Sequence, residues 1–263
     1  MIDFVSLGNP SHPSLFLLHG GNIGWKMWEP LMETLSTCYY CFAVNLPGLR
    51  EKNPDLESPS FEEDIVRSLS EFIQNKHLYP CALLGHSFGA KLAVKLSHMF
   101  TFPALVLFNP SGFSSYLPFK QLLLKKSSVL TSFLIKKRFP LKPNCVRSFL
   151  EESLINKNAL SRDLVMEYTD FLIKGGTHPL LLFRKMASLL PLSDSELSKM
   201  RASTLIIAGE QDPLIPPRTL YRSGLIPNVK TIFLPKTGHV SPLEAPKECA
   251  SLIHNFVTSH ALS

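Results

Sequence analysis

A serine in this sequence stands in a setting that is typical of a nucleophile. Ser87 is the centre of the pentapeptide Gly85-His86-Ser87-Phe88-Gly89, which lies between the apolar residues 83–84 and a segment with apolar residues at helical spacing, residues 90–97. A Gly-x-Ser-x-Gly turn between a strand and a helix holds the serine hydroxyl in a strained, projecting position. We expect glycine on both sides because backbone passes close to backbone there. A chance match in an ordinary glycine-rich turn is the alternative, and the flanking strand and helix argue against it.

A histidine and an aspartate follow two later apolar runs. Asp212 comes shortly after residues 202–208, and His239 comes shortly after residues 229–234. A nucleophilic serine needs an imidazole to take its proton, and the imidazole needs a carboxylate that fixes its tautomer. The sequence therefore predicts the catalytic residues Ser87, Asp212 and His239. Glu210 is the alternative acid.

A glycine-rich stretch also follows the apolar residues 14–18. It begins His19-Gly20-Gly21-Asn22, and it matches neither the Gly-x-Gly-x-x-Gly nor the Gly-Lys-Ser/Thr pattern of nucleotide-binding loops. We predict that the backbone N–H groups of Gly21 and Phe88 form an oxyanion hole beside the serine. His19 and Asn22 are candidate substrate-binding residues, and His19, like the histidine before the serine, is also expected to shape its loop through hydrogen bonds.

Apolar runs and helical patterns alternate along most of the chain. The runs at residues 14–18, 39–46, 104–108 and 202–208 alternate with helical patterns such as residues 25–35 and 61–74. This order predicts an α/β fold with a mostly parallel sheet and helices on both faces. Residues 112–192 contain apparent helices and no convincing strand. We therefore predict a core of residues 1–111 and 193–263, with residues 112–192 as a helical cap over Ser87.

The predicted cap is strongly basic. Residues 112–190 carry 13 lysine and arginine residues against five aspartate and glutamate residues, whereas the whole chain carries 27 against 21. This excess is consistent with an acidic substrate, an acidic partner protein or an anionic membrane surface. For a site that transfers acyl groups, it favours a small acyl substrate that is anionic or is carried on an acidic acyl carrier protein. Lysines that merely keep an apolar cap soluble are the alternative, and peripheral contact with a membrane is not favoured. Phe119, Leu123 and Phe133, in a helical pattern, are candidates to line the acyl pocket.

The composition indicates an ordinary globular protein. The chain has 263 residues, of which 45% are hydrophobic, and no stretch approaches the length of a membrane span. Its N-terminus does not resemble a signal peptide, and five irregularly placed cysteines favour a reducing compartment, so we expect a cytoplasmic protein. The lone pair Cys38 and Cys41 is weak evidence for a metal or redox site. We expect no bound metal and no nucleic-acid partner.

With these residues in view, the chain resembles the α/β-hydrolase family. The resemblance rests on the motifs His-Gly-Gly-Asn at 19–22, Gly-His-Ser-Phe-Gly-Ala at 85–90, Gly-Glu-Gln-Asp-Pro at 209–213 and Gly-His-Val-Ser-Pro-Leu-Glu-Ala-Pro at 238–246. It covers the chain except the predicted cap, and it implies the chain order serine, aspartate, histidine. The family's first strands look short or missing here, and Asn45 stands where family members often have aspartate.

The resemblance leaves several functions open. Ser87 argues against haloalkane dehalogenases, which resemble this chain but use an aspartate nucleophile. We predict a carboxylic ester or thioester hydrolase that works through an acyl-enzyme and requires no cofactor. A carbon–carbon bond hydrolase of the meta-cleavage type is the alternative enzyme, and a ligand receptor on the same fold is the non-enzymatic alternative.

Overall fold

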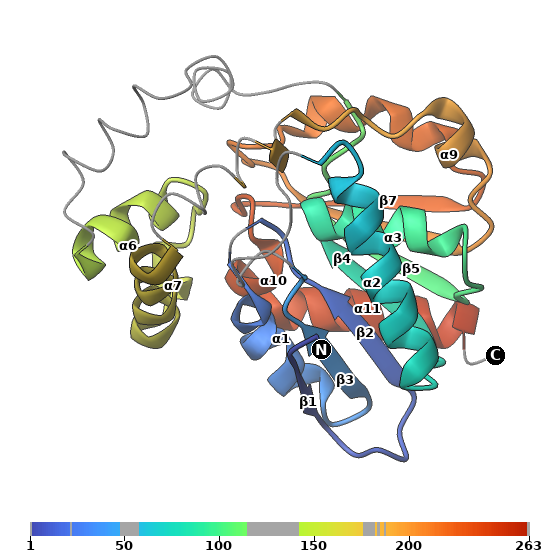
Figure 1. Cartoon of the computed structure of the whole chain (residues 1–263), viewed down its shortest axis with the longest axis horizontal. Helices are drawn as coiled ribbons and strands as arrows, with labels where there is room; N and C mark the ends of the chain where they lie inside the picture. Colours follow the sequence, from blue (N-terminus) through green and yellow to red (C-terminus); the bar gives the residue numbers. More distant parts are fainter. Residues whose placement is uncertain are drawn as a thin grey trace.

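In the residues that the structure describes, seven strands form one sheet. The computed structural model describes residues 2–21, 23–47, 58–114, 142–175, 182, 185–186 and 188–261. The strands are β1 (Phe4–Leu7), β2 (Ser14–Leu18), β3 (Tyr40–Val44), β4 (Ala82–His86), β5 (Ala104–Phe108), β6 (Ser203–Gly209) and β7 (Val229–Leu234). Their order is β1-β3-β2-β4-β5-β6-β7, with β1 antiparallel to β3 and every other neighbouring pair parallel (Figure 1). The predicted, mostly parallel sheet is confirmed.

The central strands are buried on both faces of the sheet. Every residue of β4 and of β5 is buried, and so are Leu15 to Leu18 in β2. A parallel strand that is covered by helices on both sides needs apolar side chains at nearly every position, rather than at alternate ones. Such strands stand out in the sequence as unbroken apolar runs. β1, by contrast, is a short edge strand with an intermediate to exposed pattern.

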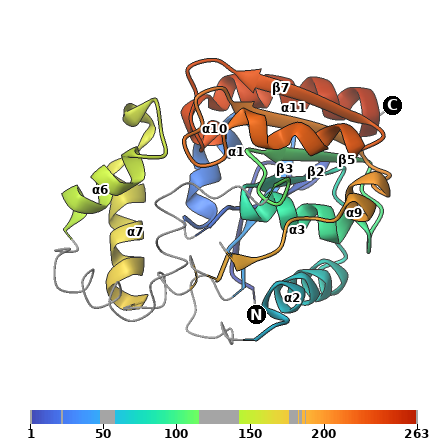
Figure 2. The same cartoon turned by 90° about the horizontal axis from the view of Figure 1, so that it is seen from above.

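Helices cover both faces, as predicted. On one face α1 (Glu29–Leu35) and α11 (Pro246–Ala261) contribute to one apolar cluster, and on the other face α2 (Phe61–Asn75) and α3 (Phe88–Ser97) contribute to a second (Figure 2). The helix expected over residues 25–35 is divided into a 3-10 turn, η1 (Trp25–Trp28), and α1. Pro30 lies in the first turn of α1, where the missing N–H of proline breaks no helical hydrogen bond.

The remaining core elements are short and follow β5, β6 and β7. They are α9 (Asp194–Ser198), η3 (Pro217–Leu225) and α10 (Ser241–Glu244). α9 begins with a capping box, in which Ser193 and Glu196 satisfy each other's backbone N–H groups. α10 follows directly after the predicted base, and this places its residues beside the candidate site.

Residues 112–192, called the insertion below, lie between β5 and β6. Their described part contains α6 (Pro143–Glu151), η2 (Lys157–Ala159) and α7 (Arg162–Gly175). The N–H of Leu192 donates to the carbonyl of Gly112 over 2.8 Å, so the insertion leaves and re-enters the core at one place. These helices agree with the helical character expected of residues 112–192, whereas the pattern containing Phe119, Leu123 and Phe133 lies outside the described residues. A separate cap domain stays a prediction.

The described residues can be compared with what the sequence indicated about membrane spans, metal sites and the cysteine pair. None of the helices in this part of the chain combines the length and the apolar character that crossing a membrane requires. No group of histidine, cysteine, aspartate and glutamate among these residues is arranged to hold a metal ion. Cys38 is exposed and Cys41 is buried, both are free thiols, and burial raises the pKa of Cys41 to about 12. The raised pKa keeps the Cys41 thiol protonated at neutral pH, which disfavours a reactive thiolate at this position.

Candidate active site

Ser87 lies at the sharp turn between β4 and α3. Its backbone has φ 50° and ψ −112°, a conformation that is strained for a residue with a side chain. A Cβ atom on Gly85 would lie 2.6 Å from the Cα of Ala90, and one on Gly89 would lie 2.3 Å from the carbonyl oxygen of Leu18. Both glycines are therefore required by close backbone packing, as the sequence pattern predicted. The turn has the geometry of a nucleophile elbow.

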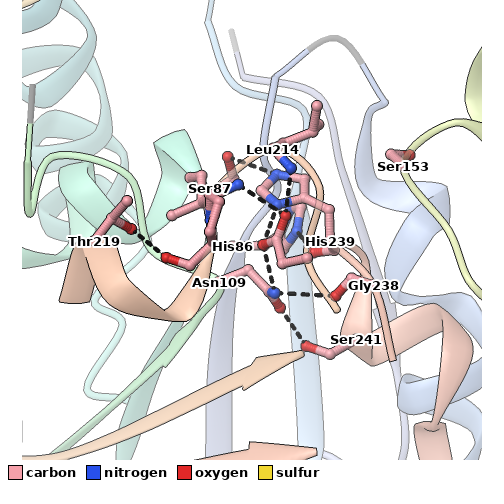
Figure 3. Close-up of polar contacts among 12 residues, drawn as sticks. His86, Ser87, Asn109, Ser153, Leu214, Thr219, Gly238, His239 and Ser241 are labelled. Atoms are coloured by element: carbon pink, nitrogen blue, oxygen red, sulfur yellow. Dashed lines mark hydrogen bonds and ion pairs between the residues drawn. The ribbon is translucent and has the colours of Figure 1, made fainter. Parts of the chain in front are cut away.

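His239 contacts both Ser87 and Asp212, and Figure 3 shows His239 beside Ser87. Its Nε2 is 3.1 Å from Ser87 Oγ, and its Nδ1 is 2.8 Å from Asp212 Oδ2. Because a carboxylate can only accept, Nδ1 carries the proton in this contact and Nε2 is left to accept from the serine hydroxyl. The structure thus brings together the three residues that were predicted from the sequence. Glu210 is exposed, and Asp212 is the carboxylate that His239 contacts.

Asp212 accepts hydrogen bonds at both carboxylate oxygens. Oδ1 accepts from the backbone N–H groups of Leu214 and Ile215 over 2.7 and 2.8 Å. Burial by itself raises the pKa of Asp212, but interactions with His239 and hydrogen bonds from Ile215 and Asn109 outweigh burial, so the pKa lies below its ordinary value. Asp212 is therefore an ionised carboxylate at neutral pH, as the support of an imidazolium requires.

Asn109 is a further site residue, and sequence reasoning missed it. It is fully buried, has φ 43°, and lies just after β5. Its Nδ2 donates to Asp212 Oδ2 over 2.8 Å and to the carbonyl of Gly238 over 3.1 Å, while its Oδ1 accepts from Ser241 Oγ over 2.6 Å (Figure 3). Asn109 thus joins the loop of the acid to the loop of the base. Its place at the carboxyl end of a central parallel strand is the signal that could have identified it.

His86 and His19 shape the loops around the site. Nε2 of His86 donates to the carbonyl of His239 over 2.8 Å, and burial together with the neighbouring His239 lowers the pKa of His86 to about 3. His19 is fully buried, with Nδ1 2.6 Å from the carbonyl oxygen of Gly20 and Nε2 accepting from the N–H of Leu46 over 3.0 Å. Both ring nitrogens of His19 are engaged within the protein. Its predicted contact with substrate therefore has no support in this structure.

The predicted oxyanion loop runs directly beside Ser87. A Cβ on Gly20 would lie 3.0 Å from the Cβ of Ser87, so the loop passes in van der Waals contact with the serine. Phe88 is the first residue of α3, and an N–H at that position has no partner within its own helix. The oxyanion hole itself stays a prediction. The candidate substrate contacts Asn22, Phe119, Leu123 and Phe133 lie outside the described residues.

The insertion approaches the site at two points. A Cβ on Gly21 would lie 3.5 Å from the Cε of Met186, so this methionine comes close to the predicted oxyanion loop. The carbonyl of Ser153 accepts from the N–H of His239 over 2.8 Å. Between the insertion and the core lies a small apolar pocket, lined by Ile23, Leu150, Ser153, Leu154, Leu160, Leu164, Tyr168, Val240 and Leu243. Neither Met186 nor Ser153 carries a sequence motif, and only the folded structure places them here.

Comparisons with known proteins identify the family and agree with this fold. A model of the alpha/beta hydrolase family matches residues 15–252. The chain is 23% identical to epoxide hydrolase 3 of Xenopus tropicalis over 97% of this chain and 74% of the relative. It is also 23% identical to an uncharacterized carboxylesterase of Bacillus subtilis strain 168, over 92% and 78% of the two chains. The fold is similar to that of a 2-hydroxy-6-oxo-6-phenylhexa-2,4-dienoate hydrolase from Rhodococcus sp. strain RHA1, with TM-score 0.80 and 15% identity over 98% and 100% of the two chains.

Proposed function

The chain belongs to the alpha/beta hydrolase family, and we propose that it is a serine hydrolase that cleaves a carboxylic ester or thioester through an acyl-enzyme on Ser87. The observation that carries the proposal is His239, whose Nε2 lies 3.1 Å from Ser87 Oγ while its Nδ1 lies 2.8 Å from Asp212 Oδ2. This arrangement can remove the proton of the serine as the hydroxyl attacks a carbonyl carbon. The carboxylesterase relative supports the choice of ester substrates.

In the first half of the reaction, Ser87 Oγ attacks the acyl carbon and its proton passes to His239 Nε2. The backbone N–H groups of Gly21 and Phe88 would stabilise the negative oxygen of the tetrahedral intermediate. The ionised Asp212 stabilises the imidazolium that has formed. When the intermediate collapses, the proton on Nε2 moves to the leaving alkoxide or thiolate, and the acyl group stays on Ser87.

In the second half, water releases the acyl group. His239 Nε2 takes a proton from the water as its oxygen attacks the acyl-enzyme, and the same proton returns to Ser87 Oγ when the carboxylic acid leaves. The side chains of Ser87, His239 and Asp212 and the two N–H groups carry out every proton transfer and charge stabilisation in this scheme. The proposal therefore needs no further reactive group.

A labelling and turnover experiment tests the proposal. We expect a fluorophosphonate probe to label the protein at Ser87, and the Ser87→Ala variant to lose both labelling and turnover of p-nitrophenyl esters of graded chain length. Acyl thioesters and a vinylogous dioxo acid belong in the same panel, because preferred cleavage of the dioxo acid would replace the ester proposal by carbon–carbon bond hydrolysis. Tight ligand binding without any turnover would favour the receptor alternative. Labelling that persists in Ser87→Ala would contradict the assignment of the nucleophile.

A further inference from the structure

We propose that Glu244 is a positioning residue that ties the base His239 to the insertion, so that the reactivity of Ser87 depends on the contact between residues 153–156 and the loop of the base. The inference rests on the proposed role of His239. It assigns a task to a buried carboxylate that the reaction scheme above does not use.

Glu244 links two loops through backbone hydrogen bonds. Its carboxylate belongs to a residue that is 8% exposed, and Oε1 accepts from the N–H of Gly238 over 3.0 Å. Oε2 accepts from the N–H groups of Ile155 and Asn156 over 2.8 and 2.9 Å. Gly238 directly precedes the base, whereas residues 155 and 156 belong to the loop between α6 and η2 in the insertion. One side chain therefore fixes the two loops relative to each other, because a buried carboxylate is stable only when its oxygens are hydrogen-bonded.

The backbone of His239 is held from two sides. Its N–H donates to the carbonyl of Ser153 in the insertion over 2.8 Å, and its carbonyl accepts from His86 Nε2 at the end of β4 over 2.8 Å. The packing on the insertion side is close, because a Cβ on Gly238 would lie 2.7 Å from the carbonyl oxygen of Ser153. The base is thus placed between the strand that carries the nucleophile and a loop of the insertion (Figure 3).

This arrangement matters for reactivity because proton transfer depends steeply on geometry. His239 Nε2 is 3.1 Å from Ser87 Oγ, within hydrogen-bond distance, and a displacement of about 1 Å in an active site can slow a reaction roughly 100-fold. If the insertion loop moved away, His239 would lose the acceptor of its N–H, and Gly238 would lose its close packing against the carbonyl of Ser153. The contrasting view is that Glu244 merely holds the insertion in place and leaves the base unaffected.

The Glu244→Gln variant separates these views. Glutamine has almost the same size as glutamate, but one of its two terminal groups is an NH2 that cannot accept a hydrogen bond. The variant therefore loses the hydrogen bonds either to Gly238 or to residues 155 and 156. We expect the rate of fluorophosphonate labelling at saturating probe, and kcat for a small neutral ester, to fall roughly 10- to 100-fold. KM should change little, and the loss should persist across the pH profile and at temperatures well below the Tm. The matched control is Glu248→Gln at an exposed position of α11, for which we expect the wild-type rate.

A second variant approaches the link from the insertion. Asn156 has φ −85°, close to the value that proline requires, so Asn156→Pro removes the N–H donor to Glu244 and leaves the carboxylate in place. Asn156→Ala keeps that N–H, and we expect it to label faster than Asn156→Pro. In the double variant Glu244→Gln with Asn156→Pro, the fold-decrease in labelling rate should be smaller than the product of the two single fold-decreases, because both changes break the same link.

The outcomes distinguish this inference from the proposed function. Absence of labelling in the wild-type protein would overturn the proposed function and the inference with it. Labelled wild-type protein, together with Glu244→Gln and Asn156→Pro variants that label at the wild-type rate per folded molecule, would overturn the inference alone. A lowered Tm with an unchanged rate would make Glu244 a purely structural residue.

Discussion

At the residue scale, the carboxylate of Asp212 determines whether His239 can act as the base for Ser87. Replacing it by asparagine keeps the shape of the side chain but removes the charge that stabilises the imidazolium and fixes its tautomer. We expect Asp212→Asn to remain folded and to lower kcat roughly 10³- to 10⁴-fold. Circular dichroism and ester turnover would check this. Glu210→Gln is the matched control, because Glu210 is exposed and the described contact of His239 is with Asp212; a comparable loss in that control would contradict the assignment of the acid.

The lowered pKa of the buried His86 should make the free energy of unfolding depend on pH. Its pKa is lowered to about 3 by burial and by the neighbouring His239, whereas a histidine in the unfolded chain has a pKa near 6.5. Between these two values the unfolded chain binds a proton that the folded protein excludes, so the free energy of unfolding falls as pH falls, by up to about 1.4 kcal/mol per pH unit.

The variant His86→Gln should reduce this pH dependence, since glutamine keeps an N–H donor for the carbonyl of His239 and does not titrate. Urea unfolding at pH 6.5, 5.5 and 4.5 measures the slope. The control His98→Gln changes an exposed histidine and should keep the wild-type slope. Equal slopes in all three proteins would show that His86 is protonated as readily in the folded state as in the unfolded chain.

At the element scale, a buried ion pair joins the two helices behind the nucleophile. Nζ of Lys91 in α3 lies 2.6 Å from Oε2 of Glu62 in α2, and it also donates to the carbonyl of Leu190 over 2.8 Å. Burial lowers the pKa of Lys91, and the Glu62 carboxylate offsets this only in part. Lys95 lies 3.4 Å from the other oxygen of Glu62. The pair therefore connects α2, α3 and the returning end of the insertion.

Breaking one side of this pair leaves a buried charge without its main partner. We expect Lys91→Met to lower the free energy of unfolding by about 3 to 5 kcal/mol. The double variant Lys91→Met with Glu62→Leu should be more stable than Lys91→Met, because it buries no unpaired carboxylate. Lys174→Met is the comparison at an exposed pair with Asp170 on α7, where we expect a loss of about 0.5 kcal/mol or less. Strictly additive effects in urea unfolding would mean that the pair is not coupled.

The sequence predicts most elements, but fewer of the contacts between them. β4 and β5 are recognisable because parallel strands buried on both faces are apolar throughout, and Ser87 is recognisable because its turn requires glycines at fixed positions. Asn109 and Glu244 are different. Asn109 contacts Asp212 and Glu244 contacts Ile155, and in each pair the two residues are more than 80 positions apart in the chain. No periodicity or motif spacing encodes such pairs. The roles of these residues follow only from the tertiary structure.

At the scale of the whole molecule, charge is unevenly distributed along the chain. Residues 112–190 hold 13 basic residues against five acidic ones, whereas the whole chain holds 27 against 21, so the rest is slightly acidic. The described part of the insertion contacts the loop of His239 through Ser153, and Met186 lies close to Gly21 in the predicted oxyanion loop. We propose that the basic excess of the insertion attracts an anionic substrate or an acidic acyl carrier and so raises its local concentration near the site.

We therefore expect kcat/KM for an anionic acyl substrate to fall as ionic strength rises from about 0.01 to 0.15 M, where the screening length shortens from about 30 to 8 Å. A neutral ester of equal chain length should be insensitive to salt, because the basic residues do not attract an uncharged substrate. Charge reversal at Lys125, Lys126, Lys136 and Lys137, which lie outside the described residues, should remove the difference between the two substrates while leaving the neutral ester unaffected. Equal salt sensitivity for both substrates, or an unchanged difference in the reversed variant, would mean that these lysines serve solubility rather than substrate attraction.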